Sequence, residues 1–254
     1  MCECEKEVLQ FKKRVSELAR KSYEHNIYTY MGFLSMAQQD ILYGMREIKD
    51  IPYKLFGGSE DCERQMLRLG SEESLGYKEE FPIVCLSVRP AIEKFADDFS
   101  HRDFLGAIMN LGIDRSTVGD IFIQGKTAYL FCMEKIAPFI IENLTKVKHT
   151  HVRCTVENAK ICVPAREPEM IKFTVSSERA DAVAAKVCQL SRNESLSLFR
   201  EKKIYVNGRI NENNSYVLKT GDMVSVRGYG RFIYYGCEYE TKKGKLSVSA
   251  GIYR

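Results

Sequence analysis

The sequence contains no apolar run near the roughly 20 residues that a helix needs to cross a bilayer. Its first residues, Met-Cys-Glu-Cys-Glu-Lys-Glu, place acidic side chains where a secretory signal has a basic stretch followed by an apolar one. The composition, with 44% hydrophobic and 28% charged residues, is that of an ordinary globular protein. We therefore expect a soluble, cytoplasmic protein without an export signal and without a membrane partner.

No two cysteines form a Cys-x-x-Cys pair. The nine cysteines are an odd number scattered over 254 residues, which favours neither a disulfide framework nor a zinc ribbon. Cys2 with Cys4, and His149 with His151, are the remaining candidate metal ligands, but they belong to distant regions and lack zinc-site spacing. We expect reduced thiols, no metal and no cofactor.

The sequence also lacks a recognisable set of catalytic residues. The run His101-Arg102-Asp103 suggests acid–base chemistry, but catalysis requires a nucleophile and an orienting partner within reach. Helix capping explains these three residues better, and we expect no catalytic residues.

Positive charge is concentrated near the end of the chain. From Lys172 onward, 15 Lys and Arg accompany 8 Asp and Glu, a net charge of +7, whereas the whole chain carries only +4. The first 171 residues therefore carry about −3. Because neutralising phosphates releases counterions, a basic segment of this kind favours a polyanionic partner.

Residues 1–74 are expected to form a helical N-terminal region. Helical spacing of apolar residues predicts a helix over residues 5–25, and Ser35 with Gln38 forms a potential capping box. The stretch Phe56-Gly57-Gly58-Ser59 predicts a turn before a third helix over Cys62–Leu69, which Gly70 would end.

Residues 75–168 are expected to form a ferredoxin-like, RNA-recognition-like middle domain, because short apolar runs give the order β-α-β-β-α-β. The expected elements are a strand at Pro82–Val88, a helix at Arg102–Leu111, a hairpin of Val118–Ile123 with Thr127–Cys132, a helix at Glu134–Leu144, and a strand at Val152–Val156 or Ile161–Val163. Pro164–Pro168 resembles a linker.

Residues 169–254 are expected to form a small α+β domain, which makes the whole chain α+β. The expected elements are a strand at Ile171–Val175, a helix capped by Ser177 with apolar positions Ala180, Val183, Ala184 and Val187, a helix from the Ser191–Glu194 capping box to Lys203, a strand at Ile204–Val206, and turns at Asn207-Gly208 and Gly221-Asp222.

Four separated stretches of this last region resemble the S-four domain, which is shared with a small-subunit ribosomal protein: Glu178-Arg179-Ala180-Asp181, Ser191-Arg192, Ile204-Tyr205-Val206-Asn207-Gly208 and Gly221-Asp222. The resemblance implies that basic residues around two helices contact structured RNA. It nominates Arg179, Arg192, Lys202, Lys203, Asn207, Arg209, Lys219 and Arg227. Arg179 and Arg192 are expected to flank one helix joint, and Asp181 to orient a neighbouring arginine or the helix terminus. The sequence departs from the family pattern at Lys202-Lys203, where a glycine is common.

The wider chain resembles the YlmH family of bacterial RNA-binding proteins. The matching stretches are Gly32-Phe33-Leu34, Phe56-Gly57-Gly58-Ser59-Glu60 with Glu63-Arg64, His101 to Ala107, and Leu111-Gly112-Ile113 with Gly119-Asp120-Ile121. The resemblance implies a ribosome-associated factor that binds ribosomal RNA or tRNA on stalled large subunits carrying peptidyl-tRNA. We expect a monomer.

Two other functions stay open. An RNA-modifying enzyme such as a pseudouridine synthase also uses an S-four domain, although usually at the amino terminus and with a catalytic motif that we do not find here. A tyrosyl-tRNA synthetase fits less well, because neither of its nucleotide-binding signatures is visible. A cell-division adaptor would need no RNA, and the +7 charge of the last region argues against it.

Replacement of Arg179 and Arg192 by Ala is expected to weaken RNA binding. If each contacts a phosphate, the slope of log affinity against log salt should fall by roughly one unit per lost contact. Titrations of labelled RNA at several salt concentrations measure this, and unchanged affinity and slope would contradict the assignment.

Overall fold

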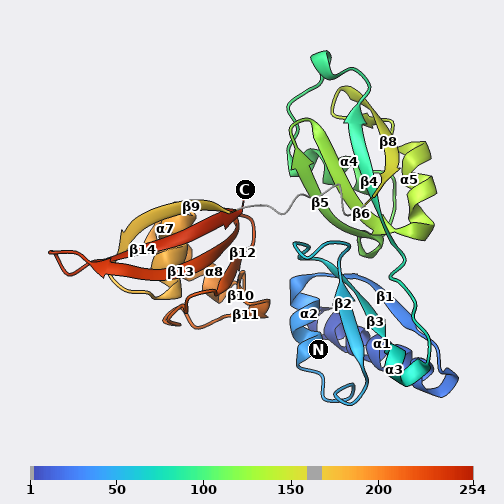
Figure 1. Ribbon diagram of the computed structural model, residues 1–254, viewed down its shortest axis with the longest axis horizontal. Helices are drawn as coiled ribbons and strands as arrows, with labels where there is room; N and C mark the ends of the chain where they lie inside the picture. Colours follow the sequence, from blue (N-terminus) through green and yellow to red (C-terminus); the bar gives the residue numbers. More distant parts are fainter. Residues whose placement is uncertain (1–2, 159–167, 254) are drawn as a thin grey trace. The chain divides into compact units, whose positions relative to one another are not determined.

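The computed structural model describes residues 3–158 and 168–253. The chain forms two compact units, Met1–Ala165 and Arg166–Arg254, each containing helices and sheets, which confirms the α+β class (Figure 1). The finer division into three domains stays a prediction. The alternative strand at 161–163, and all but the last residue of the expected linker at 164–168, lie outside the described residues. In the described part, no helix is both long and apolar enough to cross a membrane.

The first part of the N-terminal unit is a helix packed on a three-stranded sheet of order β1-β3-β2. Its elements are α1 (Glu3–His25), β1 (Thr29–Leu34), α2 (Met36–Tyr43), β2 (Tyr53–Phe56), β3 (Gln65–Leu69) and α3 (Glu72–Leu75). The predicted helix α1 buries Phe11, Val15 and Leu18 against this sheet. The predicted capping box is also confirmed, since Gln38 accepts the backbone N–H of Ser35 at 2.8 Å.

The predicted helix over Cys62–Leu69 is wrong, and residues 1–74 are therefore not purely helical. Residues Gln65–Leu69 form β3, the central strand of the sheet. Met66 faces one core, whereas Leu67 and Leu69 face another, so the strand is apolar on both sides. A short run of this kind has no period that distinguishes a strand from a buried helix. Gly70, expected to end a helix, instead ends this strand with a φ of +101°.

The second part of the N-terminal unit has the predicted β-α-β-β-α-β order. Its elements are β4 (Ile83–Pro90), η1 (Glu93–Phe95), α4 (His101–Met109), η2 (Arg115–Thr117), β5 (Val118–Gln124), β6 (Thr127–Met133), η3 (Glu134–Ile136), α5 (Ala137–Asn143), β7 (Lys146–Val147) and β8 (Thr150–Glu157). The antiparallel sheet, hereafter the middle sheet, has the order β5-β6-β4-β8-β7. Phe104 of α4 and Ile140 of α5 pack against Leu86 and Leu130 on one of its faces.

The two sheets of this unit approach each other closely at β1 and β5. A Cβ on Gly32 would lie 2.5 Å from the carbonyl oxygen of Ser116, and one on Gly119 would lie 2.7 Å from the ring of Phe33. Since real Cβ atoms do not approach this closely, glycine at both positions permits the contact. The ring of Phe33 is thereby buried.

Polar groups hold the same contact. Oδ2 of Asp120 accepts the backbone N–H groups of Glu63 at 2.5 Å and Arg64 at 3.1 Å. The guanidinium of Arg64 donates to the carbonyl oxygens of Phe33 at 2.8 Å and Val118 at 3.3 Å. Burial raises the pKa of Asp120, and burial with the neighbouring Arg115 lowers the pKa of Arg64 to about 10. These hydrogen bonds therefore offset part of the desolvation cost of charged groups at this contact.

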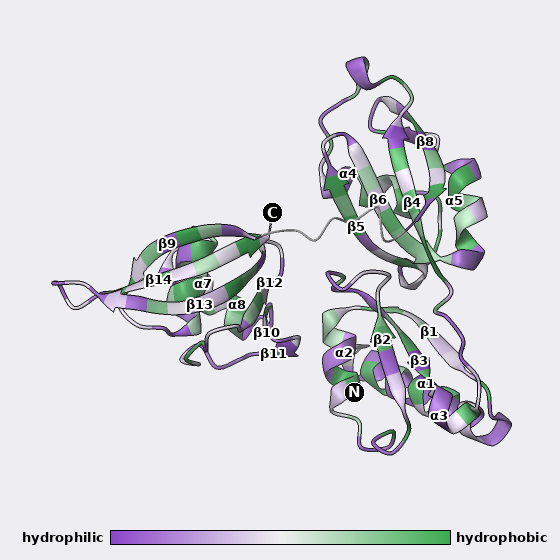
Figure 2. Cartoon of the chain, in the orientation of Figure 1, coloured by the Kyte–Doolittle hydropathy of each residue, from purple (hydrophilic) through white to green (hydrophobic). Residues whose placement is uncertain are grey.

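The C-terminal unit packs two helices on one face of a six-stranded sheet of order β11-β10-β12-β13-β14-β9 (Figure 1). Its elements are β9 (Glu169–Val175), α7 (Ala180–Val187), α8 (Arg192–Arg200), β10 (Ile204–Val206), β11 (Arg209–Ile210), β12 (Met223–Val226), β13 (Gly230–Glu240) and β14 (Leu246–Tyr253). The colouring of Figure 2 shows hydrophobic residues along α7 and β14.

Local predictions in the C-terminal unit are confirmed at the second helix and the hairpin. Glu194 accepts the backbone N–H of Ser191 at 2.8 Å, and Asn207 and Gly208 both have positive φ, as a tight hairpin turn requires. The predicted cap of α7 and the predicted end of α8 are wrong. The residue that caps α7 is Arg179 rather than Ser177, because its carbonyl accepts the first hydrogen bonds of the helix. Helix α8 ends at Arg200 because Lys202 adopts a φ of +56°.

Asp103 serves as a helix cap, as the sequence indicated. Its carboxylate accepts the N–H and the hydroxyl of Ser100, both at 2.7 Å, and it pairs with Nζ of Lys148 at 2.9 Å. The hydrogen bond from the Ser100 hydroxyl is the largest cause that lowers the pKa of Asp103 to about 2, followed by that from Lys148. Because its folded-state pKa lies below the ordinary value of about 3.9, the carboxylate stabilises the fold at higher pH, and this contribution is lost as the pH falls toward 2.

We expect NMR titration of the Asp103 carboxyl carbon to give a pKa near 2 and the Ser100→Ala variant to raise it, because the variant removes the hydroxyl donor. Lys148→Gln, which removes only the cation, should raise the pKa less. An unchanged pKa in Ser100→Ala would show that the cap does not control this carboxyl group.

Candidate nucleic-acid interface

Arg179 lies at the start of α7, where its guanidinium is paired. Nε and Nη2 donate to the two carboxylate oxygens of Asp181 at 3.0 and 2.9 Å. Asp181 is only 1% exposed, whereas the side chain of Arg179 is 32% exposed. The expectation that Asp181 orients a neighbouring arginine is therefore confirmed. Removing Arg179 would leave a buried carboxylate without its cation, so a loss of RNA binding in that variant would be mixed with a loss of stability.

Arg192, the first residue of α8, lies beside a hollow in the surface of the C-terminal unit. The side chains of Lys186 and Lys245 line the same hollow, together with Ala182, Ala185 and Leu190. Lys186, Arg192 and Lys245 are all exposed, and in the described part of the chain no ion pair involves them. Three cations around one concave surface can bind a phosphate group without first breaking internal ion pairs. We call this surface the cationic hollow.

The expectation that Arg179 and Arg192 flank one helix joint is wrong. Arg179 precedes α7, whereas Arg192 follows its end, so the eight residues of α7, about 12 Å, separate them. Arg179 instead neighbours Lys219, because Arg179 bridges to Val217 and the N–H of Leu218 donates to the carbonyl of Glu178.

A second group of predicted residues surrounds the start of β10. The N–H of Arg227 donates to the carbonyl of Lys203 at 2.9 Å, which brings these two basic residues together. Their neighbour Lys202 pairs with Glu212 at 3.0 Å, and Lys203 pairs with Glu201 at 2.5 Å. Arg209 is exposed on β11, opposite Val206 of β10. These basic side chains are close together, but two of them share their charge with acids.

The side-chain amide of Asn207 is used within the fold. Its Nδ2 donates to Asp222 at 2.9 Å, and its Oδ1 accepts the N–H of Met223 at 2.9 Å. Asp222 also accepts the backbone N–H of Lys219 at 2.8 Å, so it ties the Gly221-Asp222 turn to the Asn207-Gly208 turn. These bonds position the backbone around Lys219 and Arg209. An RNA contact by Asn207 stays a prediction.

Sequence reasoning did not find Lys186 and Lys245. Each stands alone among residues of no particular pattern, and the hollow forms only when α7 packs beside the hairpin of β13 and β14. A second hollow also contains Lys186, together with Tyr229 and Tyr253. The exposed ring of Tyr229 therefore lies near a cation, an arrangement that suits stacking on a base beside its phosphate.

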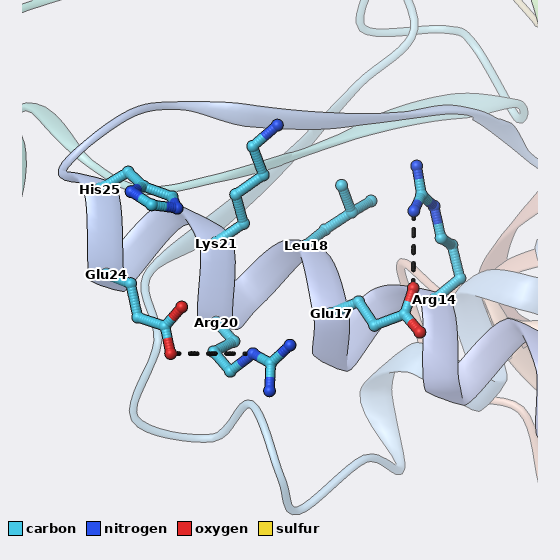
Figure 3. Close-up of a pocket in the computed structure, with 7 residues that line it drawn as sticks. All are labelled: Arg14, Glu17, Leu18, Arg20, Lys21, Glu24 and His25. Atoms are coloured by element: carbon cyan, nitrogen blue, oxygen red, sulfur yellow. Dashed lines mark ion pairs between the residues drawn. The ribbon is translucent and has the colours of Figure 1, made fainter.

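The hollow on α1 is not a comparable site. Figure 3 shows its lining side chains, which all project from one helix. Arg14 pairs with Glu17 at 3.5 Å and Arg20 with Glu24 at 3.8 Å, so acids neutralise part of its positive charge. Exposed pairs of this kind, three or four residues apart on one helix, are common and stabilise the helix only slightly.

Three buried or half-buried thiols, those of Cys132, Cys154 and Cys188, are poor nucleophiles. Burial raises the pKa of Cys132 to about 12, and those of Cys154 and Cys188 to about 11, so these thiols are protonated at neutral pH. Within residues 3–158 and 168–253, no three His, Cys, Asp or Glu side chains group in a way that could hold a metal ion.

Comparisons with known proteins identify relatives over most of the chain. Residues 77–160 match the family model described as the putative RNA-binding domain in YlmH. The chain is 32% identical over 218 residues to the ribosome-associated protein quality control protein P2 of Bacillus subtilis, covering 85% of this chain and 84% of that protein. A solved structure, the cell division protein ylmH from Streptococcus pneumoniae, is 17% identical with a TM-score of 0.47, covering 62% of this chain and 93% of its own.

The left-handed backbone of Lys202 costs stability, because a Cβ is unfavourable at a φ of +56°. We expect Lys202→Gly to stabilise the C-terminal unit by about 1 kcal/mol. Lys202→Ala is the matched control, since it also removes the ion pair with Glu212 but keeps the Cβ. Urea unfolding followed by NMR signals of β10 and β12 measures the difference. Equal midpoints for the two variants would contradict this explanation.

Proposed function

Because this chain belongs to the YlmH family, we propose that it is a non-catalytic RNA-binding protein that acts in ribosome-associated quality control. The partner is ribosomal RNA or tRNA, and the site of action is a stalled large subunit that carries peptidyl-tRNA. The name of the Bacillus subtilis relative supports the pathway, and the description of the matched family model supports the ligand.

The cationic hollow is the observation that carries this proposal. Lys186, Arg192 and Lys245 place three positive charges around one concave surface, in a region with a net charge of +7. Proteins bind RNA with clustered cations because each neutralised phosphate releases counterions. Arg192 also belongs to the stretches that resemble the S-four domain, so the resemblance and the shape of the surface both point to this residue.

The residues around Lys203, Arg209 and Arg227 form a second basic group in the same unit. A phosphate that approaches Lys202 or Lys203 must compete with Glu212 or Glu201. Because exposed ion pairs contribute only about 0 to 1 kcal/mol, this competition costs little. The cationic hollow therefore supplies the first contact, and the β10 region adds contacts once RNA is bound.

An enzymatic role has less support. The thiols of Cys132, Cys154 and Cys188 are protonated at neutral pH, and Asp103 caps a helix rather than activating a neighbour. An adaptor role in cell division would not require three clustered cations. The adaptor role predicts that changes in the cationic hollow leave association with ribosomal particles unaltered, so the experiment below also tests it.

We expect the Lys186→Gln, Arg192→Gln, Lys245→Gln triple variant to lose association with large subunits. In sucrose gradients of cell lysate at low salt, the intact protein should migrate with free large subunits and leave them as the salt concentration rises. The triple variant should stay at the top of the gradient, because three phosphate contacts are lost.

A matched control replaces Arg200, Lys242 and Lys243 by Gln, which removes the same charge from exposed positions that do not line the hollow. The control should migrate like the intact protein. Migration of the triple variant with large subunits would overturn the assignment of the hollow. An intact protein that never leaves the top of the gradient would instead favour a free-RNA enzyme or an adaptor.

A further inference from the structure

The middle sheet has one face packed against α4 and α5, and the described residues of its own unit cover only part of the opposite face. On that opposite face, Phe122 and Phe131 pack with Phe33 and Met66 from the N-terminal three-stranded sheet. Phe131 is 0% exposed and Phe122 is 8% exposed. RNA-recognition sheets usually stack bases on aromatic rings of this face. Here the two rings are already buried by the chain itself and cannot stack on a base.

The uncovered half of the same face is basic. Arg89 at the end of β4 stands opposite Arg153 of β8, and Lys146 of β7 stands opposite His151 of β8. Successive side chains along a strand point to opposite faces of the sheet. The neighbouring residues Val88, Val147 and Val152 belong to the core on the face that α4 and α5 cover. All four basic side chains therefore project from the opposite face, and all four are exposed. Figure 2 shows β4 changing from hydrophobic to hydrophilic toward this end.

An anion on this surface would reduce the repulsion between Arg89 and Arg153. Like charges directly opposite each other on neighbouring strands destabilise a sheet. The acid on this face of β4, β7 and β8 is Glu157, which pairs with Arg89 at 2.7 Å. Arg153 and Lys146 form no ion pair with any residue that the structure describes. The surface thus keeps an excess of positive charge.

RNA fits this surface better than an acidic protein segment does. The other side chains that β4 and β8 place on this half of the face are Ser87, Thr155 and Glu157, all polar. The nearest aromatic ring, that of Tyr129 opposite Ser87 on β6, packs against the core that contains Phe122 and Phe131. Protein interfaces are enriched in aromatic residues and depleted in lysine. A row of phosphates needs cations and hydroxyl donors, which this surface supplies on adjacent strands.

We propose that Arg89, Lys146, His151 and Arg153, hereafter the sheet strip, bind the phosphodiester backbone of RNA, so that this sheet holds RNA by charge and not by base stacking. The inference rests on the proposed function and names a second contact surface for the same partner. Binding at the sheet strip is independent of base identity and weakens as salt is added.

The test uses the full chain and a labelled RNA hairpin of roughly 20 base pairs, long enough to cover a surface of this kind. Lys146→Gln with Arg153→Gln should weaken binding roughly tenfold and lower the salt slope by about two units, one for each lost phosphate contact. Glu157→Gln should act in the opposite direction, because it releases Arg89 while keeping an acceptor for the hydroxyl of Ser87.

The matched control is Arg102→Gln with Lys135→Gln, which removes the same charge from exposed positions outside this face. The control should bind like the intact protein, and circular dichroism should show that all variants are folded. The triple variant of the cationic hollow is measured in parallel. If it weakens binding while the sheet-strip variant does not, the sheet strip is wrong and the proposed function stands. If the intact protein does not bind the hairpin, both proposals are overturned.

Discussion

The carboxylate of Asp120 joins two sheets that are distant in sequence, and the arrangement of the N-terminal unit depends on this contact. It accepts backbone N–H groups from Glu63 and Arg64, while the guanidinium of Arg64 reaches carbonyl oxygens on β1 and at the start of β5. A carboxylate with two such bonds is oriented, and the oriented group fixes where the second sheet lies. Phe33, Phe122 and Phe131 then become a single core.

The stretches that resemble the YlmH family meet at this contact. Gly32-Phe33, Glu63-Arg64 and Gly119-Asp120 lie in three separate parts of the sequence, yet their atoms touch. Gly32 and Gly119 permit close approach, and Arg64 and Asp120 satisfy buried polar groups. These residues therefore hold the two sheets together. The surfaces proposed to bind RNA lie elsewhere in the sequence.

Local signals in the sequence predicted local structure well. The capping boxes at Ser35 and Ser191 and the Asn207-Gly208 turn depend on neighbouring residues only, and all three are present. The strand β3 was mistaken for a helix because its identity depends on pairing with β1 and β2, which no short window contains.

The candidate sites also depend partly on short sequence motifs and partly on contacts between distant residues. The S-four resemblance selected Arg192, whereas its two companions in the hollow required the packed fold. The sheet strip depends on the register of three strands, since a shift of one residue would turn Arg153 or Lys146 toward the other face. Charge counts along the chain found the basic C-terminal region but did not reveal a basic surface on the mildly acidic remainder.

The shared core of the two sheets has a consequence for synthesis on the ribosome. Phe33 and Met66 leave the exit tunnel before Phe131, which is translated about sixty residues after Met66. At roughly 5 to 20 residues per second, the nascent N-terminal sheet exposes an unpaired apolar face for about 3 to 12 s. A pause in translation near residue 120 would prolong this exposure and favour aggregation of the nascent chain.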